Sequence, residues 1–529
     1  MNQRARRRLS ATLAATAVVA TGLSTGLAGT AAPARAAVPA SQATASAVAW
    51  LADELGDDDL LGTPAAPDVT ATLDLGLGLA RTGADPALLA RVREGIDGAL
   101  AGYLGEPGDR TRASRVAKAA GFYTAAGADI SLVGGEPSLL QRLEQVVRDT
   151  DGGLDSTYLD GTIEVPYEDL FNQSAAVAAL IGPDADAGEP FSGEGQQALT
   201  YLLTYRCAGA GWGFHADGTD PASACTSDVD TTSLAIAALQ PITGDERIAA
   251  AVAQASLWLK SQQAADGSFG QSAFLPYNTN STGLAATALA AAGQTSAATK
   301  AAAWVRSHQL TGFACDRALQ GETGAITYSD EALASDLVDG LGSRSEITLA
   351  TAQAFPALTL APAATADLAV TAPRFVPAGS RVPLTVTGLA PGERGCVSLN
   401  GTSAAVVGRT APSTTLAVPA GTKGYTAAVQ VPGARALASV VALAPKTLPL
   451  VRRSATVARG GSQTVRVTGL VAGENVTVRY GSTIVGTGVA SSEGIFRVTF
   501  AVGRTAGAKT VVARGQFENR RGSIGFTVR

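Results

Sequence analysis

The feature that most constrains the fold is a helical repeat in the first 360 residues. Two segments, ASLWLKSQQAADGSFG from Ala255 and AAAWVRSHQLTGFAC from Ala301, each join a helical pattern that bears a tryptophan to a turn containing Gly and Phe. Their tryptophans, Trp258 and Trp304, are 46 residues apart, and an Ala-rich helical pattern follows each turn. A single helix pair cannot bury its apolar face alone, so such units must stack on one another.

The Ala-rich helices of these units align with one another. Three of them start at Asp230, Asn280 and Ser329, and the alignment makes equivalent the residues Leu234, Leu284 and Leu333. Three weaker helix pairs precede them, which brings the total to six. Six antiparallel pairs can close into a ring with small side chains inside, where the helices converge, and no end repeat is left uncapped. We therefore predict an (α/α)6 toroid over residues 38–360, without strands.

The C-terminal part of the chain has a different residue pattern, with alternating Val, Thr and Gly and few helix formers. The segments VTGLAPGERGCVSLNG from Val386 and VTGLVAGENVTVRYG from Val467 repeat at an offset of 81 residues. Short alternating runs separated by Gly-containing corners are typical of β-sandwiches. The predicted fold class is thus multidomain, α then β: a toroid followed by two immunoglobulin-like β-sandwiches, at 365–446 and 447–529. Such modules commonly serve as spacers or adhesion units.

The N-terminus predicts export from the cell. Four arginines precede a mildly apolar stretch, and Ala34-Arg35-Ala36 forms a small-x-small cleavage site. We expect a signal peptide over residues 1–36 and a secreted, extracellular mature protein. No later segment has the roughly 18 uninterrupted apolar residues that a membrane span requires.

Charge and histidine content exclude several functional classes. The net charge of −5 offers no basic surface for nucleic acid. The two histidines, His215 and His308, have no second ligand at helical spacing, so we expect no metal site and no cofactor. The chain has neither a Gly-x-Ser-x-Gly motif nor a phosphate loop.

Residues 45–360 resemble the prenyltransferase and squalene-cyclase repeat family, whose α/α toroids carry this Trp-Leu outer helix and Asp-Gly-Ser-Phe turn. The match is most specific over residues 198–314. The segment DVDTT, Asp228–Thr232, is similar to the Asp-x-Asp-Asp-Thr motif of class II terpene cyclases, but Thr231 stands where that family has a further Asp. The resemblance implies that Asp230 would be the acid that protonates an alkene.

Other features favour a structural role for Asp230. A cyclase stabilises its carbocation with aromatic faces in a dry cavity, yet the inner helices offer mainly Ala, Leu, Thr and Gly. Asp230 and Asn280 occupy matching helix starts, where short polar side chains cap free backbone N–H groups, as Ser329 or Asp330 would in the next helix. We therefore interpret Asp230 as a helix cap, and retain Asp228 and Asp230 as catalytic candidates.

The N-terminal ends of the inner helices, here called the mouth, are the predicted ligand site. All of these ends would open on one face of a ring, where their dipoles favour polar or anionic groups. The loops there place aromatic rings beside acids and an amide, as in sugar-binding clefts, and the candidate ligand residues are Trp212, Phe214, Asp228, Asp230, Tyr277, Asn278, Tyr328 and Asp330. The alternative is that these aromatic side chains only fill the opening of the toroid and bind no ligand.

The predicted function is a secreted, non-catalytic binding or cell-surface interaction protein, monomeric, whose partner is an unidentified glycan, small molecule or surface protein. Two alternatives are a glycan-active enzyme and a degenerate cyclase that uses Asp230 as its acid. A glycosidase needs two carboxylates about 5–9 Å apart, and Asp228, Asp230, Asp330 and Glu168 are candidates.

Four cysteines in an exported chain predict disulfides. Cys207 and Cys225 bracket one long Gly-rich loop, and closing it would stabilise the fold by about 3 kcal/mol in the chain-entropy model. Cys315 and Cys396 would then be free or joined to each other. A rival pairing of Cys207 with Cys315 would also join neighbouring loops.

Overall fold

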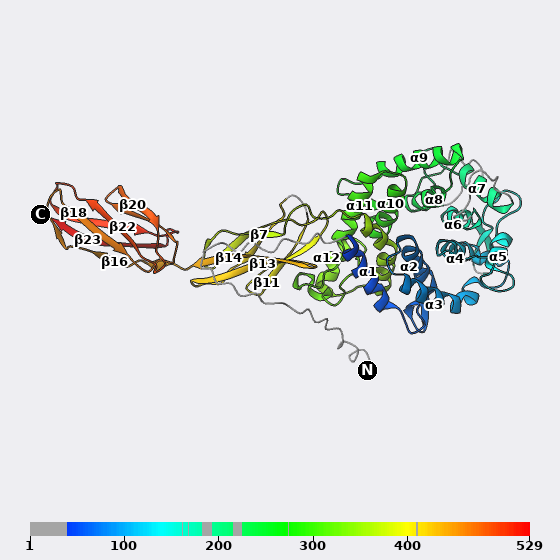
Figure 1. The fold of residues 1–529 in the computed structure, drawn as a ribbon, viewed down its shortest axis with the longest axis horizontal. Helices are drawn as coiled ribbons and strands as arrows, with labels where there is room; N and C mark the ends of the chain where they lie inside the picture. The colour runs from blue at the N-terminus through cyan, green and yellow to red at the C-terminus, as the bar shows by residue number, and fades with distance from the viewer. Residues whose placement is uncertain are drawn as a thin grey trace, which may run out of the picture. The chain divides into compact units, whose positions relative to one another are not determined.

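The computed structural model describes residues 40–160, 162–167, 169–181, 193–214, 225–272, 275–408 and 411–529. The signal peptide predicted for residues 1–36 lies outside these ranges. Up to residue 360 the described chain is mainly helical, and from residue 369 onward it is built of strands (Figure 1). Within the same ranges, no helix combines the length and the apolar character that crossing a bilayer requires.

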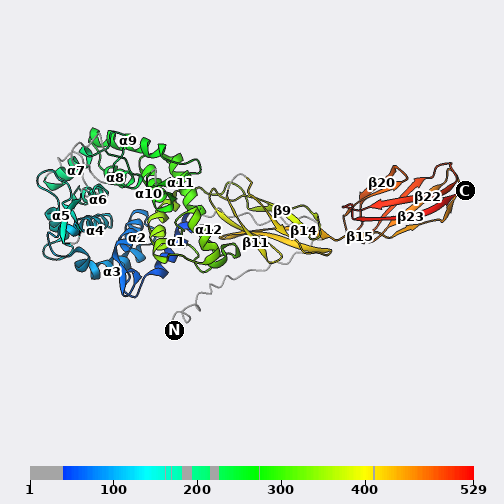
Figure 2. The same cartoon turned by 180° about the vertical axis from the view of Figure 1, so that it is seen from behind.

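The helical part consists of two alternating sets of helices. The outer set is α1 (Ala40–Glu54), α3 (Pro86–Leu104), α5 (Leu139–Val146), α7 (Glu194–Thr204), α9 (Glu246–Ser261) and α11 (Thr295–Ser307). The inner set is α2 (Val69–Thr82), α4 (Ala113–Ala125), α6 (Leu170–Ile181), α8 (Val229–Leu239), α10 (Thr279–Ala291) and α13 (Arg344–Ala354). Each inner helix packs against the next, and α13 packs against α2, so the inner set closes into a ring (Figures 1 and 2).

Small residues allow the inner helices to approach one another. The clearest case is Gly283 on α10, where an added Cβ atom would lie 2.6 Å from the Cα atom of Ala354 on α13. Alanines such as Ala235, Ala285 and Ala352 are fully buried along the same helices. The Ala-rich composition therefore reflects close helix packing, because larger side chains at these contacts would push the helices apart.

The prediction that the helix starting at Ser329 belongs to the inner set was wrong. That segment forms α12 (Asp330–Asp339), which packs against the 3₁₀ helix η2 (Ala314–Leu319), and Leu333 is its one buried residue. The inner position is filled by α13, whose face of small and apolar residues is buried. Four acidic residues on α12 explain the difference, since burying unpaired carboxylates against other helices is costly.

The expectation of no strands before residue 360 was also wrong. Short antiparallel pairs connect outer to inner helices: β1 (Leu61–Thr63) with β2 (Ala66–Asp68), β3 (Ser156–Asp160) with β4 (Ile163–Tyr167), and β5 (Phe269–Gly270) with β6 (Tyr277–Asn278). The chain reverses direction between antiparallel helices, and pairing of the two extended segments satisfies their backbone hydrogen-bonding groups. The remaining short elements are the 3₁₀ helices η1 (Arg110–Arg112) and η3 (Phe355–Leu360).

The first β part has two sheets. One has the strand order β11-β10-β13-β14-β8 and the other β12-β9-β7. The strands are β7 (Ala369–Thr371), β8 (Phe375–Pro377), β9 (Arg381–Thr387), β10 (Arg394–Leu399), β11 (Thr402–Val407), β12 (Ser413–Ala417), β13 (Lys423–Val431) and β14 (Ala434–Leu443). On β9 the alternating residues Val382, Leu384 and Val386 are buried, so one face of its sheet is covered.

The second β part has its own hydrophobic core and again two sheets. In one the order is β15-β23-β22-β19-β20, with β17 also pairing with β23, and in the other it is β16-β18-β21. The strands are β15 (Lys446–Thr447), β16 (Leu450–Arg452), β17 (Thr456–Val457), β18 (Ser462–Val467), β19 (Asn475–Tyr480), β20 (Thr483–Val489), β21 (Phe496–Ala501), β22 (Gly507–Arg514) and β23 (Arg520–Val528).

The predicted disulfide between Cys207 and Cys225 is present, and of the two outcomes left open for Cys315 and Cys396 the structure shows the bond. Cys207 is joined to Cys225, and Cys315 on η2 is joined to Cys396 on β10. The rival pairing of Cys207 with Cys315 is therefore excluded. Beside the second bridge, the Arg394 guanidinium lies 3.1 Å from the Asp316 carboxylate, and both side chains are buried. A covalent bond and a buried ion pair thus connect the helical part to the first β part.

Candidate functional site

The residues that cap the inner helices α8 and α10 lie two positions earlier than the predicted Asp230 and Asn280. Asp228 caps α8, and its carboxylate accepts a hydrogen bond from the backbone N–H of Thr231 at 2.7 Å. Asn278 caps α10 in the same way, through the N–H of Ser281. The interpretation of Asp230 as the cap was therefore wrong. Asp228 has the extended backbone that a cap requires, with φ −111° and ψ 139°, whereas Asp230 is already inside the first helical turn.

A recurring hydrogen bond fixes the loops that precede the inner helices. The hydroxyl of a buried threonine in the inner helix accepts a hydrogen bond from a backbone N–H in the preceding segment. The donor and acceptor pairs are Leu61 with Thr72, Trp212 with Thr232, Phe269 with Thr282 and Ile326 with Thr351. In α6 the Gln173 side chain takes the same place, accepting from Leu154. These hydrogen bonds identify equivalent positions in the inner helices. Because Thr351 lies on α13, they make α13, rather than α12, the equivalent of α8 and α10.

Asp230 lies in this first turn of α8 with one unsatisfied oxygen. Its Oδ1 atom is buried and has no hydrogen-bond partner among the described residues, and the same holds for Oδ1 of Asn280 at the equivalent position of α10. Burial raises the pKa of Asp230 to about 7, the charge of Asp228 adds to this rise, and the Ser281 hydroxyl opposes it. Near neutral pH this carboxyl can thus hold a proton, as a general acid must.

The aromatic residues predicted for the mouth do not form one open surface. Trp212 is fully buried, and its indole N–H donates to the Leu202 carbonyl at 2.7 Å. Phe214 is half-buried and packs against Phe171, with ring centroids 5.7 Å apart. Tyr277 is 53% exposed. Trp212 therefore fits the alternative, in which the aromatic side chains fill space inside the toroid and do not contact a ligand.

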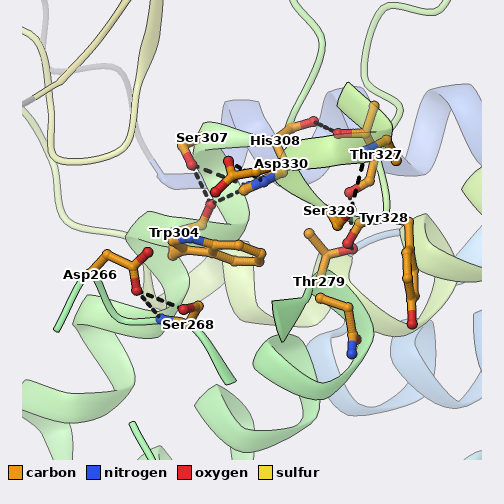
Figure 3. Close-up of polar contacts among 12 residues, drawn as sticks. Asp266, Ser268, Thr279, Trp304, Ser307, His308, Thr327, Tyr328, Ser329 and Asp330 are labelled. Atoms are coloured by element: carbon orange, nitrogen blue, oxygen red, sulfur yellow. Dashed lines mark hydrogen bonds and ion pairs between the residues drawn. The ribbon is translucent and has the colours of Figure 1, made fainter. Parts of the chain in front are cut away.

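Tyr328 and Asp330 lie in different surroundings (Figure 3). Tyr328 is half-buried, and its pKa is raised by burial and by the charges of Glu346 and Asp230. Asp330 lies 3.2 Å from the buried imidazole of His308, whose Nδ1 atom lies 3.0 Å from the carbonyl of Trp304. Glu168 and His215 lie outside the described residues.

A cavity of about 580 Å³ lies inside the ring, toward the C-terminal ends of α2, α8, α10 and α13 and thus away from the predicted mouth. All six inner helices and η3 line it. Most of its wall is apolar, and the larger contributors are Leu77, Phe122, Phe171, Leu234, Leu284, Pro356 and Leu360. Sequence reasoning placed no ligand in this region.

A chain of polar contacts crosses one side of the cavity. The Lys118 ammonium lies 2.7 Å from Asp74 Oδ1, and the Gln353 amide donates to Asp74 Oδ2 at 2.9 Å. The Asn280 amide in turn donates to Gln353 at 2.7 Å. These contacts connect α4, α2, α13 and α10. Asp74 and Lys118 were not singled out from the sequence, although a charged residue on an otherwise small and apolar inner helix is a signal that could have identified them.

Arg81, in the last turn of α2, also lines the cavity. Its side chain is exposed, while the surrounding protein lowers the pKa of the guanidinium and the charge of Asp74 opposes that effect. No group of three or more His, Cys, Asp or Glu side chains suited to a metal ion occurs in the described ranges. In the part of the chain that the structure describes, the ionisable groups that line the cavity come from α2 and α4.

The chain is similar to several solved structures at low sequence identity. No protein-family model and no curated protein matches it. A protein from Actinoplanes is 18% identical with a TM-score of 0.39, over 61% of this chain and 99% of that chain. The type II terpene cyclase MstE from Scytonema is 16% identical with a TM-score of 0.43, over 60% and 97%. The ent-copalyl diphosphate synthase from Streptomyces platensis is 16% identical with a TM-score of 0.35, over 55% and 50%. Similarity at this level carries no conclusion about the activity of this chain.

Proposed function

We propose that this chain is a secreted, non-catalytic binding protein, with an α/α toroid over residues 38–360 and immunoglobulin-like domains at 365–446 and 447–529. The toroid binds a small, mainly apolar ligand in the cavity enclosed by its inner helices. The cavity itself carries this proposal, since about 580 Å³ lies within the range of roughly 300–1,000 Å³ that small-molecule sites occupy. The disulfides and the predicted signal peptide support an extracellular location.

The composition of the wall favours binding over carbocation chemistry. Among the described residues, Phe122 and Phe171 are the only aromatic ones that line the cavity, and the same space contains the cation of Arg81 and the ion pair of Asp74 with Lys118. A positive intermediate is stabilised by aromatic faces and destabilised by nearby cations. The same wall suits an apolar ligand that undergoes no charge development.

A bulky side chain in the cavity wall is expected to abolish ligand binding. Ala237 on α8 lines the cavity, so Ala237→Phe fills the space that a ligand would occupy. We expect the affinity of the purified protein for the neutral apolar probe N-phenyl-1-naphthylamine to fall by at least about tenfold, which corresponds to about 1.4 kcal/mol. Probe fluorescence measures the affinity, and circular dichroism verifies that the variant is folded.

The matched control is Ala253→Phe, the same substitution at an exposed position of the outer helix α9, which should leave probe affinity unchanged. Ala178→Phe on α6 fills the cavity from another wall and should reproduce the loss seen with Ala237→Phe. If the wild-type protein does not bind the probe, or if both cavity variants bind it as wild type does, the cavity is not the ligand site.

Acid catalysis at Asp230 is the second candidate function. The observation that favours it is the buried, unpartnered carboxyl oxygen of Asp230 together with a pKa of about 7. If the chain cyclises an isoprenoid, Asp230→Asn should abolish product formation while probe binding in the cavity persists. Absence of product from wild type with a series of polyprenyl substrates would reject this candidate.

The glycan alternatives have less support. Among the predicted carboxylates, Asp228 is engaged as a helix cap and Asp330 lies beside His308. A glycan at the mouth remains a prediction that depends on Tyr277, the one predicted ligand aromatic that is largely exposed.

A further inference from the structure

The cavity of the ring has an unbalanced charge. Among the described residues, its ionisable lining residues are Asp74, Arg81 and Lys118, and the other lining side chains are neutral. Asp74 and Lys118 neutralise each other at 2.7 Å, and both are largely buried. Arg81 makes no hydrogen bond or close ion pair within the described part of the chain, although it feels the charge of Asp74. One positive charge is therefore left without a direct partner in a mainly apolar space.

Arg81 is a cation in the last turn of α2, where it interacts favourably with the helix dipole. Its exposed side chain also lines the cavity, so the guanidinium is available to a ligand in that space. The guanidinium is a planar donor whose geometry matches a carboxylate or phosphate group.

We propose that the cavity selects amphipathic ligands that carry a single negative charge, with the apolar body between the inner helices and the anionic group on Arg81. This inference rests on the proposed binding function and defines its ligand class. A ligand with one negative charge would balance the cavity, whereas a neutral ligand would leave Arg81 without a partner and a cationic ligand would be repelled.

Three competitors with the same hydrocarbon chain test this selectivity. Oleate, oleyl alcohol and oleylamine carry negative, neutral and positive head groups, and each would be titrated against N-phenyl-1-naphthylamine bound to the full exported chain. We expect oleate to displace the probe at about a tenfold to hundredfold lower concentration than oleyl alcohol, as a charge-assisted hydrogen bond predicts, and oleylamine to be weakest.

The Arg81→Met variant should lose this preference. Its apparent affinity for oleate should fall to that of oleyl alcohol, while oleyl alcohol itself binds within about twofold of its wild-type affinity, since the hydrocarbon contacts are retained. Arg81→Lys should keep most of the preference because the charge remains. Arg247→Met, which removes an exposed cation from α9, is the matched control and should behave as wild type.

Two results would overturn the inference while leaving the proposed function intact. One is equal displacement by all three competitors, and the other is a preference for oleate that persists in Arg81→Met. Binding of the chain to phosphatidylglycerol vesicles, with no displacement by monomeric oleate, would assign the anion site to a membrane head group and would also overturn it. Failure of the wild-type chain to bind the neutral probe would instead reject the proposed function.

Discussion

At pH 8, the Asp230→Asn variant is expected to be more stable than the wild-type protein by on the order of 3 kcal/mol. Burial is the main cause, because an ionised carboxylate with an unpartnered oxygen is costly inside the ring. Asparagine has the same shape and carries no charge. A substitution at the catalytic candidate would thus stabilise the protein, which is unusual for a single change inside a packed structure.

The pH dependence follows from the direction of the shift. The pKa of Asp230 is about 7 in the folded chain against an ordinary value of 3.8, so between these values the folded state binds more protons than the unfolded state. The contribution of Asp230 to wild-type stability therefore falls as pH rises from about 4 to 7 and changes no further above that range. The two proteins should be equally stable at pH 3.5, and the advantage of Asp230→Asn should reach its full size by pH 8.

Urea unfolding at several pH values, followed by circular dichroism at 222 nm, measures this difference, because the helices dominate that signal. Asp245→Asn provides a matched control, since Asp245 is a partly exposed carboxylate whose pKa is lowered by Arg247. That variant should be slightly less stable than wild type at pH 8, the opposite sign. Equal stabilities of wild type and Asp230→Asn at pH 8 would show that Asp230 is hydrated or paired in solution.

Trp212→Ala is expected to destabilise the helical part by about 3–5 kcal/mol, as large aromatic deletions in a core do. Trp212 is fully buried, and its indole N–H is bonded to the Leu202 carbonyl on α7. The variant therefore loses apolar contacts and also leaves a buried carbonyl unsatisfied. The same urea titration at 222 nm would record the loss.

Trp212→Phe separates a core role from a ligand-binding role. It retains much of the ring volume, so it should lose less stability than Trp212→Ala, and the folded protein should bind N-phenyl-1-naphthylamine within about twofold of wild type. A Trp212→Phe protein that is as stable as wild type but loses the probe would make Trp212 part of the ligand site.

Local patterns were sufficient for the broad organisation of this chain. Helical periodicity with Trp-bearing and Ala-rich segments predicted an α-helical part, and the 81-residue repeat from Val386 predicted a β-rich part after it. The disulfide between Cys207 and Cys225 was also predicted, because these cysteines bracket a long, Gly-rich loop, whereas the bond between Cys315 and Cys396 was one of two outcomes left open. Each of these inferences depends on residues near in sequence or on simple counting.

Tertiary contacts decided which residues face the interior. The sequence analysis assigned the acidic α12 to the inner set, and only the packing of α13 against α2 and α10 shows that α13 completes this set. Likewise, Asp228 and Asp230 are both plausible caps in the sequence, and the register of buried threonines such as Thr232 distinguishes them. The meeting of Asp74, Lys118 and Gln353 in one cavity joins three helices far apart in the chain. Periodicity assigns a residue to a face of its helix. Which residues of other helices contact that face depends on how the inner helices converge. This convergence therefore determines the charge and the shape of the cavity.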